Sequence, residues 1–253
     1  MCVGGHTFPR GARARPRGCS TTGGLWHGTK NDAVVSSRTQ FLAVLDEQTR
    51  RDVRRSARRR RYERHERLFH EGDPSDGMHL VDLGWIAIRS STPAGDVATL
   101  AIIGPGEPVG EQSLIATGAT RSATAFALTA VESLYLGRDA FDDLRARHPS
   151  VDRFLATLLE DRLRRVSERL TEALYVPAPE RVLRRLLDAA ESLGDRPVPL
   201  TQLDLASLAG TTRPTVNRIL RSAEHAGAIV LHRGDIEVVD RVLLGRLART
   251  RRT

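Results

Sequence analysis

The chain has 253 residues, of which 40% are hydrophobic, a composition that is ordinary for a protein with a buried core. Its formal net charge is +8 at pH 7, and no apolar run approaches the roughly 20 residues that a membrane span needs. Because the first residues also lack the apolar core of a secretory signal, we expect a cytoplasmic protein with no membrane partner.

The basic residues are unevenly distributed along the chain. Residues 1–38 carry six basic residues and one acid, and residues 50–67 carry ten Arg and three acids. The last 76 residues carry 13 basic and nine acidic residues, so the middle of the chain is acidic. This distribution suggests a polyanionic partner for some regions only. A solvated helix face explains the run at 50–67 equally well.

The residues that build metal centres and common catalytic motifs are missing or scattered. Cys2 and Cys19 are the only cysteines, they form no C-x-x-C pair, and the eight His are spread along the chain. We therefore expect no metal, haem or iron–sulfur cluster. There is no Gly-rich nucleotide loop ending in Lys-Ser/Thr, no nucleophile elbow and no paired-His motif, so we do not expect an enzyme.

The first segment, residues 1–38, is rich in Gly, Arg, Ser and Thr and has no periodicity. It predicts a disordered basic tail, with the alternative that the start is assigned too far upstream. A helical pattern follows, in which Phe41, Leu42, Leu45 and Val53 are the apolar positions.

After Arg67 the pattern changes to short apolar or alternating runs, which predict a β-barrel or sandwich. Strands are expected to continue through 123–128 and 131–136. Turn residues cluster at four places: Glu71–Gly77, Leu83–Gly84, Thr92–Gly95 and Gly104–Gly106.

Helix returns at Arg138–Arg147, and one long helix is expected from Val151 to about Tyr175. Pro177 and Pro179 end it and mark a hinge. Its apolar positions step by three and four residues, which is typical of a coiled-coil seam and favours a homodimer through residues 156–173 over packing on its own barrel. These positions are Ala156, Leu159, Leu163, Val166, Leu170 and Ala173.

The C-terminal segment has the pattern of a winged helix-turn-helix. Thr201 can cap a first helix, Gly210 supplies the turn, and Arg213–Glu224 forms a second helix with Pro214 in its first turn. Two strands around 229–231 and 236–239 would form the wing. A helical protein-contact module of the same topology is the alternative.

Two Arg lie on the part of the second helix that reads bases in a helix-turn-helix, since Arg can bond both O6 and N7 of guanine. Threonine hydroxyls near the helix start are suited to phosphate contacts. The expected DNA-binding residues are Thr201, Thr211, Thr212, Arg213, Thr215, Asn217 and Arg218.

The loop GEQSLIATGATRSA, residues 110–123, has an acid and a base at opposite ends of an otherwise apolar stretch. Arg121 and Ser122 are suited to holding a phosphate, and Glu111 can accept from a sugar hydroxyl. The alternative is a Glu111–Arg121 salt bridge whose only role is to stabilise the loop.

The predicted barrel, long helix and winged module, with G-E-x-x-L followed by R-S-A, resemble the Crp/Fnr family of bacterial regulators over roughly residues 40–245. The resemblance implies an α+β fold with three parts after the tail. These are a cyclic-nucleotide-binding β-roll of jelly-roll-like form at 39–149, a dimerisation helix at 150–176, and a winged helix-turn-helix DNA-binding domain at 177–253.

The resemblance also implies roles for individual residues. Glu111 would hold the ribose 2′-hydroxyl, Arg121 and Ser122 the cyclic phosphate, and Gly110 would allow close backbone approach. In the long helix Arg162 and Ser167 match the family's run, the Ser reaching the base from the other subunit. Val166 stands where that run has a Thr, and one hydrogen bond to the base is lost.

The function implied is a transcriptional regulator under the control of a cyclic nucleotide, cyclic AMP rather than cyclic GMP. Its partners would be a palindromic DNA operator, a second copy of the chain and RNA polymerase. In the recognition helix Pro214 replaces a Glu that reads the inner base pair, so we expect altered discrimination there. The alternative is a regulator of the same type that binds DNA without a ligand, with Glu111–Arg121 as a structural salt bridge.

Overall fold

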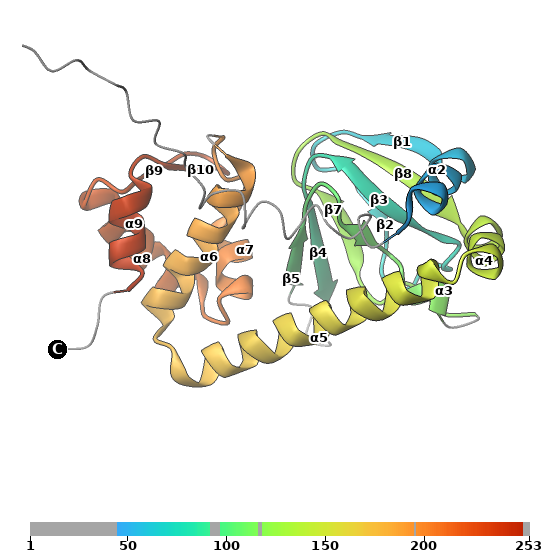
Figure 1. The fold of residues 1–253 in the computed structure, drawn as a ribbon. Coiled ribbons are helices and arrows are strands. Elements are labelled where there is room, and N and C mark those ends of the chain that lie inside the picture. Colours follow the sequence, from blue (N-terminus) through green and yellow to red (C-terminus); the bar gives the residue numbers. More distant parts are fainter. Residues whose placement is uncertain (1–44, 92–96, 116–117, 195, 250–253) are drawn as a thin grey trace, which may run out of the picture. The chain divides into compact units, whose positions relative to one another are not determined.

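The computed structural model describes residues 45–91, 97–115, 118–194 and 196–249, drawn in colour in Figure 1. Three sequence-based expectations lie outside the described residues: the tail at 1–38, the helical positions Phe41 and Leu42, and the turn at Thr92–Gly95.

Eight strands form two antiparallel four-stranded sheets, with strand orders β1-β8-β3-β6 and β2-β7-β4-β5. Apolar side chains from both sheets, including Val81, Ile86, Ile103 and Val131, are buried in one cluster between them. The strands are β1 (Arg58–Tyr62), β2 (Arg67–Phe69), β3 (Gly77–Leu83), β4 (Ile86–Ser91), β5 (Val97–Ile103), β6 (Pro108–Val109), β7 (Thr124–Ala127) and β8 (Val131–Gly137).

The turn at Leu83–Gly84 shows why glycine is needed between β3 and β4. Gly84 has φ of +89°, and a Cβ there would lie 2.2 Å from the carbonyl oxygen of Ala130. Only glycine combines this backbone conformation with so close an approach.

Helices cover one end of this β unit. α2 (Glu47–Ser56) begins at Asp46, whose side chain accepts from the Thr49 amide. α4 (Arg138–Arg147) has the expected bounds, and α3 (Gln112–Ile115) is a single turn. The buried side chains of this region, which form one cluster with the start of the next helix, are Leu45, Val53, Phe141, Leu144, Val151, Phe154, Leu155 and Leu158.

The long helix α5 (Ser150–Tyr175) has 26 residues and two apolar faces. One face, at Val151, Phe154, Leu155 and Leu158, is buried against α4 and the β unit. The other face is exposed in the single chain and consists of the residues predicted for the seam: Ala156, Leu159, Leu163, Val166, Leu170 and Ala173.

The C-terminal part contains the expected two-helix motif and wing around its own apolar core. Pro177 precedes α6, and Gly210 has φ of +59° in the turn between α7 and α8. The elements are α6 (Ala178–Leu193), α7 (Gln202–Leu208), α8 (Arg213–His225), β9 (Ile229–Leu231), β10 (Ile236–Val238) and α9 (Arg241–Leu247). The antiparallel sheets and the helices together confirm the predicted α+β fold.

Candidate functional site

A cavity of about 470 Å³ lies between the loop after β6, strand β5 and helix α5. Its volume is within the range of small-molecule sites. Ser167 does not line it, and its side chain is exposed. The other six residues predicted to bind the ligand do line it: Gly110, Glu111, Arg121, Ser122, Arg162 and Val166.

Arg121 is buried in the cavity wall. Its Nη1 donates to the Gly110 carbonyl oxygen at 3.0 Å, and its Nη2 donates to Asp76 at 3.1 Å. The guanidinium carbon lies 4.2 Å from the centre of the Phe69 ring. Burial lowers the pKa of Arg121, and the charge of Asp76 opposes that effect. Because Asp76 is 74% exposed, its attraction is screened by water, and a buried anion would be a stronger partner.

Gly110 makes this position of Arg121 possible. Its φ is +84°, and a Cβ there would lie 2.4 Å from Arg121 Nη1. Any other residue would therefore strain the backbone and displace the guanidinium.

Glu111 is fully buried, and its Oε1 lies 2.5 Å from Arg162 Nη1 of α5. Arg162 also donates to the Pro108 carbonyl oxygen at 2.9 Å. Burial raises the pKa of Glu111, and the Arg162 charge counters this. No residue that the structure describes donates a hydrogen bond to Oε2. Glu111 is thus paired with Arg162 of the long helix, and the Arg121 charge of the sequence-based alternative also lowers the pKa of Glu111.

The remaining wall is mixed in character. The Ser122 hydroxyl donates to Gln112 Oε1 at 3.2 Å, and Val166 adds a side chain without hydrogen-bonding atoms. Strand β5 supplies an apolar side through Leu100 and Ile102. The cavity thus combines a guanidinium and a hydroxyl group, from Arg121 and Ser122, with the buried carboxylate of Glu111. Strand β5 adds an apolar surface against which a ring could pack.

The second candidate site is the exposed side of α8. Thr212 caps this helix by accepting from the Thr215 amide, and the adjacent Arg213 is exposed. Arg218 is also exposed, and Asn217 accepts a hydrogen bond from Gln202. Arg213, Asn217 and Arg218 are therefore each accessible on α8.

Thr201 caps the start of α7, as its place in the sequence suggested. Its hydroxyl donates to the Asp204 carboxylate and accepts from the Asp204 amide, which closes a capping box at the start of α7. The same buried carboxylate accepts from Arg89 at 2.9 Å and from Thr99 at 2.8 Å. Burial raises the pKa of Asp204, but the hydrogen bonds from Thr201 and Thr99 and the charge of Arg89 together lower it below its usual value.

Several residues of the two sites were not predicted. Asp76 and Phe69, which hold Arg121, lie 45 and 52 residues before it, and no local pattern connects them with the loop. Glu107, which is buried and 3.2 Å from Arg165, was not predicted either. Its only signal in the sequence is that it is an acid three residues before the Gly110-Glu111 pair of the loop.

Two further properties concern the described residues alone. They include no cluster of three or more His, Cys, Asp and Glu placed to hold a metal ion. None of their helices is both long enough and apolar enough to cross a bilayer.

The sequence profiles of two domains match this chain. The profile described as "Cyclic nucleotide-binding domain" covers residues 59–148, and the one described as "Crp-like helix-turn-helix domain" covers residues 180–247. The first range contains the cavity loop and the second contains α7 and α8.

Curated relatives match most of the chain. A protein of Thermus thermophilus named "Cyclic AMP receptor protein" is 37% identical over 194 residues, which are 75% of this chain and 88% of the relative. A "CRP-like cAMP-activated global transcriptional regulator" of Mycobacterium tuberculosis is 32% identical over 189 residues, 72% of this chain and 84% of the relative.

Solved structures share the fold at lower sequence identity. The regulator CLP of Xanthomonas campestris has a TM-score of 0.64 at 22% identity, covering 76% of this chain and 99% of that one. A CRP/FNR-family transcriptional regulator of Thermus thermophilus has the same TM-score at 23% identity, covering 77% and 100%. With a cyclic nucleotide-binding domain followed by a Crp-like helix-turn-helix, this chain belongs to the Crp/Fnr family, whose members are transcriptional regulators and not enzymes.

Proposed function

We propose that this regulator binds cyclic AMP in the cavity and that the bound nucleotide changes its affinity for DNA. The observation that carries the proposal is the buried Glu111 carboxylate. Its Oε2 receives no hydrogen bond from the described residues, although it lies in the same cavity wall as the Arg121 guanidinium. A buried acceptor without a donor is costly, and a ribose hydroxyl would supply that donor.

The other groups of the cavity suit the rest of a cyclic nucleotide. Arg121 and Ser122 would hold the cyclic phosphate, to which a guanidinium can donate two parallel hydrogen bonds. Leu100, Ile102 and Val166 would contact the base. Val166 provides no hydrogen bond there, so the choice of cyclic AMP over cyclic GMP follows the names of the two curated relatives.

The regulator would act as a homodimer on a palindromic operator. Leu163, Val166 and Leu170 are all more than 60% exposed on α5, and a second copy of the helix would bury them. Ser167, exposed beside this seam, would reach the nucleotide of the partner subunit. Two copies of α8 would present Arg213 and Arg218 to two half-sites. RNA polymerase would be the further partner of the DNA-bound dimer.

Calorimetry with cyclic AMP and cyclic GMP tests the nucleotide site. We expect Arg121→Ala to weaken cyclic AMP binding at least tenfold, since charge-assisted hydrogen bonds contribute about 1.5–3 kcal/mol each. Arg153→Ala, on the exposed surface of α5, is the matched control and should bind as the unaltered chain does. If neither nucleotide binds while a cognate operator still does, the chain regulates without such a ligand.

A further inference from the structure

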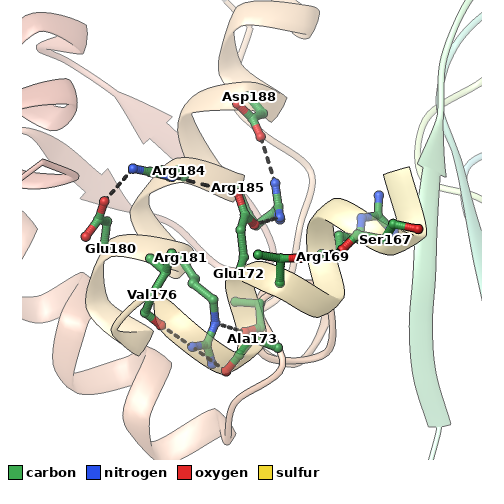
Figure 2. A network of polar contacts seen from close by, with 12 residues as sticks. Ser167, Arg169, Glu172, Ala173, Val176, Glu180, Arg181, Arg184, Arg185 and Asp188 are labelled. Carbon is green, nitrogen blue, oxygen red and sulfur yellow. Dashed lines mark hydrogen bonds and ion pairs between the residues drawn. The ribbon is translucent and has the colours of Figure 1, made fainter. Parts of the chain in front are cut away.

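Arg181, in the first turn of α6, differs from most arginines of this chain because its side chain is buried. It is 9% exposed, and no carboxylate pairs with it among the described residues. Figure 2 shows its guanidinium beside the end of α5, near the carbonyl oxygens of Ala173 and Val176. A buried cation needs strong acceptors, so the atoms around it indicate what it does.

The guanidinium binds backbone carbonyls from two different helix ends. On one side Nη1 donates to the carbonyl oxygens of Val176 and, at 3.5 Å, Ala173. On the other side Nε donates to Ala209 at 2.7 Å and Nη2 donates to Gly210 at 3.0 Å. One side chain therefore connects the end of α5 with the end of α7.

The physical basis is the unsatisfied C-terminus of a helix. The last carbonyls of a helix lack partners within the helix and carry its partial negative charge. Helix α5 ends at Tyr175 and α7 ends at Leu208, so all four acceptors lie in or just after the last turns. A planar guanidinium spreads five donors over three nitrogens and reaches both ends at once, whereas the three donors of a lysine all lie on one nitrogen.

The α7 end that Arg181 holds leads directly into the recognition helix. Gly210 makes the turn with φ of +59°, and Thr212, two residues later, is the N-cap of α8. At the other end of the connection, α5 carries Arg162, which is paired with Glu111 in the cavity. Helix α5 and Arg181 thus form a continuous physical path from the cavity to the start of α8.

We propose that Arg181 is a positioning residue that fixes the start of α8 relative to the end of α5. A change in α5 at the cavity would then move or release the recognition helix through Arg181. The coupling part of this proposal rests on the proposed control by a cyclic nucleotide. The positioning part holds for the chain without any ligand.

Neighbouring ion pairs provide a control for general effects on the hinge. Glu172 of α5 is paired with Arg184 and Arg185 of α6, and Arg185 also binds Asp188 (Figure 2). The pairs with Glu172 join α5 and α6 through side chains only, and Arg185–Asp188 lies within α6. They do not reach the turn before α8.

The test compares Arg181→Lys with Arg184→Lys in the full chain. Both changes keep the positive charge. Only Arg181→Lys removes a guanidinium that donates to carbonyl oxygens at the ends of both α5 and α7. Hydrogen–deuterium exchange of the nucleotide-free protein would follow a peptide covering residues 211–218. We expect exchange about tenfold faster in Arg181→Lys, because local opening follows loss of tertiary support, and no change in Arg184→Lys.

The coupling is measured as the ratio of operator affinities with and without cyclic AMP. Allosteric ratios are typically about 5–150-fold, and Arg181→Lys should bring this ratio close to one. Cyclic AMP affinity measured by calorimetry should stay within about twofold, because Arg181 lies outside the cavity lining.

Each outcome decides one point. If exchange at 211–218 is unchanged in a folded Arg181→Lys protein, the positioning role is wrong. Equal acceleration in every peptide, or in Arg184→Lys as well, shows general destabilisation and also overturns it. If the unaltered chain shows no response to cyclic AMP, the proposed function fails, and the exchange experiment alone still decides the role of Arg181.

Discussion

Glu111 and Arg162 join the buried acid of the cavity loop to the long helix, with 2.5 Å between Oε1 and Nη1. Glu111 comes from the loop after β6 and Arg162 from the middle of α5, so the pair connects the candidate ligand site with the element that carries the exposed seam. A ligand that binds Glu111 therefore has direct access to α5.

The first prediction concerns Glu111→Gln. The amide is nearly the same size but has no charge, so it binds both Arg162 and a ribose hydroxyl more weakly. Since hydrogen bonds to charged groups contribute about 1.5–3 kcal/mol, we expect cyclic AMP affinity to fall about 10–100-fold in calorimetry. Glu168→Gln, which alters an exposed acid of helix α5, should leave it unchanged. If Glu111→Gln binds cyclic AMP as tightly as Glu168→Gln does, Glu111 does not contact the nucleotide.

Gly110→Ala tests the close approach of Arg121. The new Cβ would lie 2.4 Å from Nη1, so the guanidinium must shift and cyclic AMP affinity should fall at least about tenfold. Gly118→Ala is the matched control, because Gly118 also has a positive φ, +72°, but no atom lies within 4 Å of its added Cβ. Both variants should lose roughly 1–2 kcal/mol of stability from backbone strain. Similar nucleotide affinities for the two would contradict this account of Gly110.

Leu163→Glu tests the seam on α5. Leu163 is exposed in the single chain, and a charge buried at a helix pair without a partner costs several kcal/mol. We expect sedimentation velocity to show monomers where the unaltered chain forms dimers. Arg164→Glu, one residue away and off the apolar stripe, should still dimerise. A dimeric Leu163→Glu protein would place the interface elsewhere.

Arg213→Ala and Arg218→Ala test the recognition helix. Both side chains are exposed on α8, and each lost contact to a base should cost about 1–3 kcal/mol in operator affinity. The measurement is fluorescence anisotropy at fixed salt on cognate and scrambled DNA. Arg221→Ala, on the same helix but paired with Glu224, should lose less discrimination. Uniform weakening on both DNAs would mean phosphate contact instead of base reading.

His79 makes stability depend on pH in mildly acidic solution. Burial lowers its pKa from 6.5 to about 4, and its Nδ1 lies 3.1 Å from the Ser133 hydroxyl oxygen. Between these pH values the unfolded chain binds the proton and the folded chain does not, so stability falls as pH decreases. The loss should reach about 3 kcal/mol by pH 4, measured by urea unfolding. His79→Gln should be less stable at pH 7 and lack most of this slope.

Local patterns predicted the secondary structure well where they are strong. The helix Arg138–Arg147, the cap at Thr201, the turn at Gly210 and the wing strands near 229–231 were all expected from periodicity and capping residues. Such signals depend on neighbours within a few residues, which is why sequence reveals them. The apolar stripe of α5 was likewise predicted from its spacing of three and four residues, and its positions are exposed in the single chain.

The sequence by itself determined the two kinds of domain, their order and the residue types of the cavity loop. Only the tertiary structure decided the partners of those residues. Arg121 is held by Asp76 and Phe69, and Arg181 joins the ends of α5 and α7. These contacts join segments that the fold brings together, and many arginines along the chain compete for each acid. The sequence therefore shows which charges are present, and packing selects the pairs.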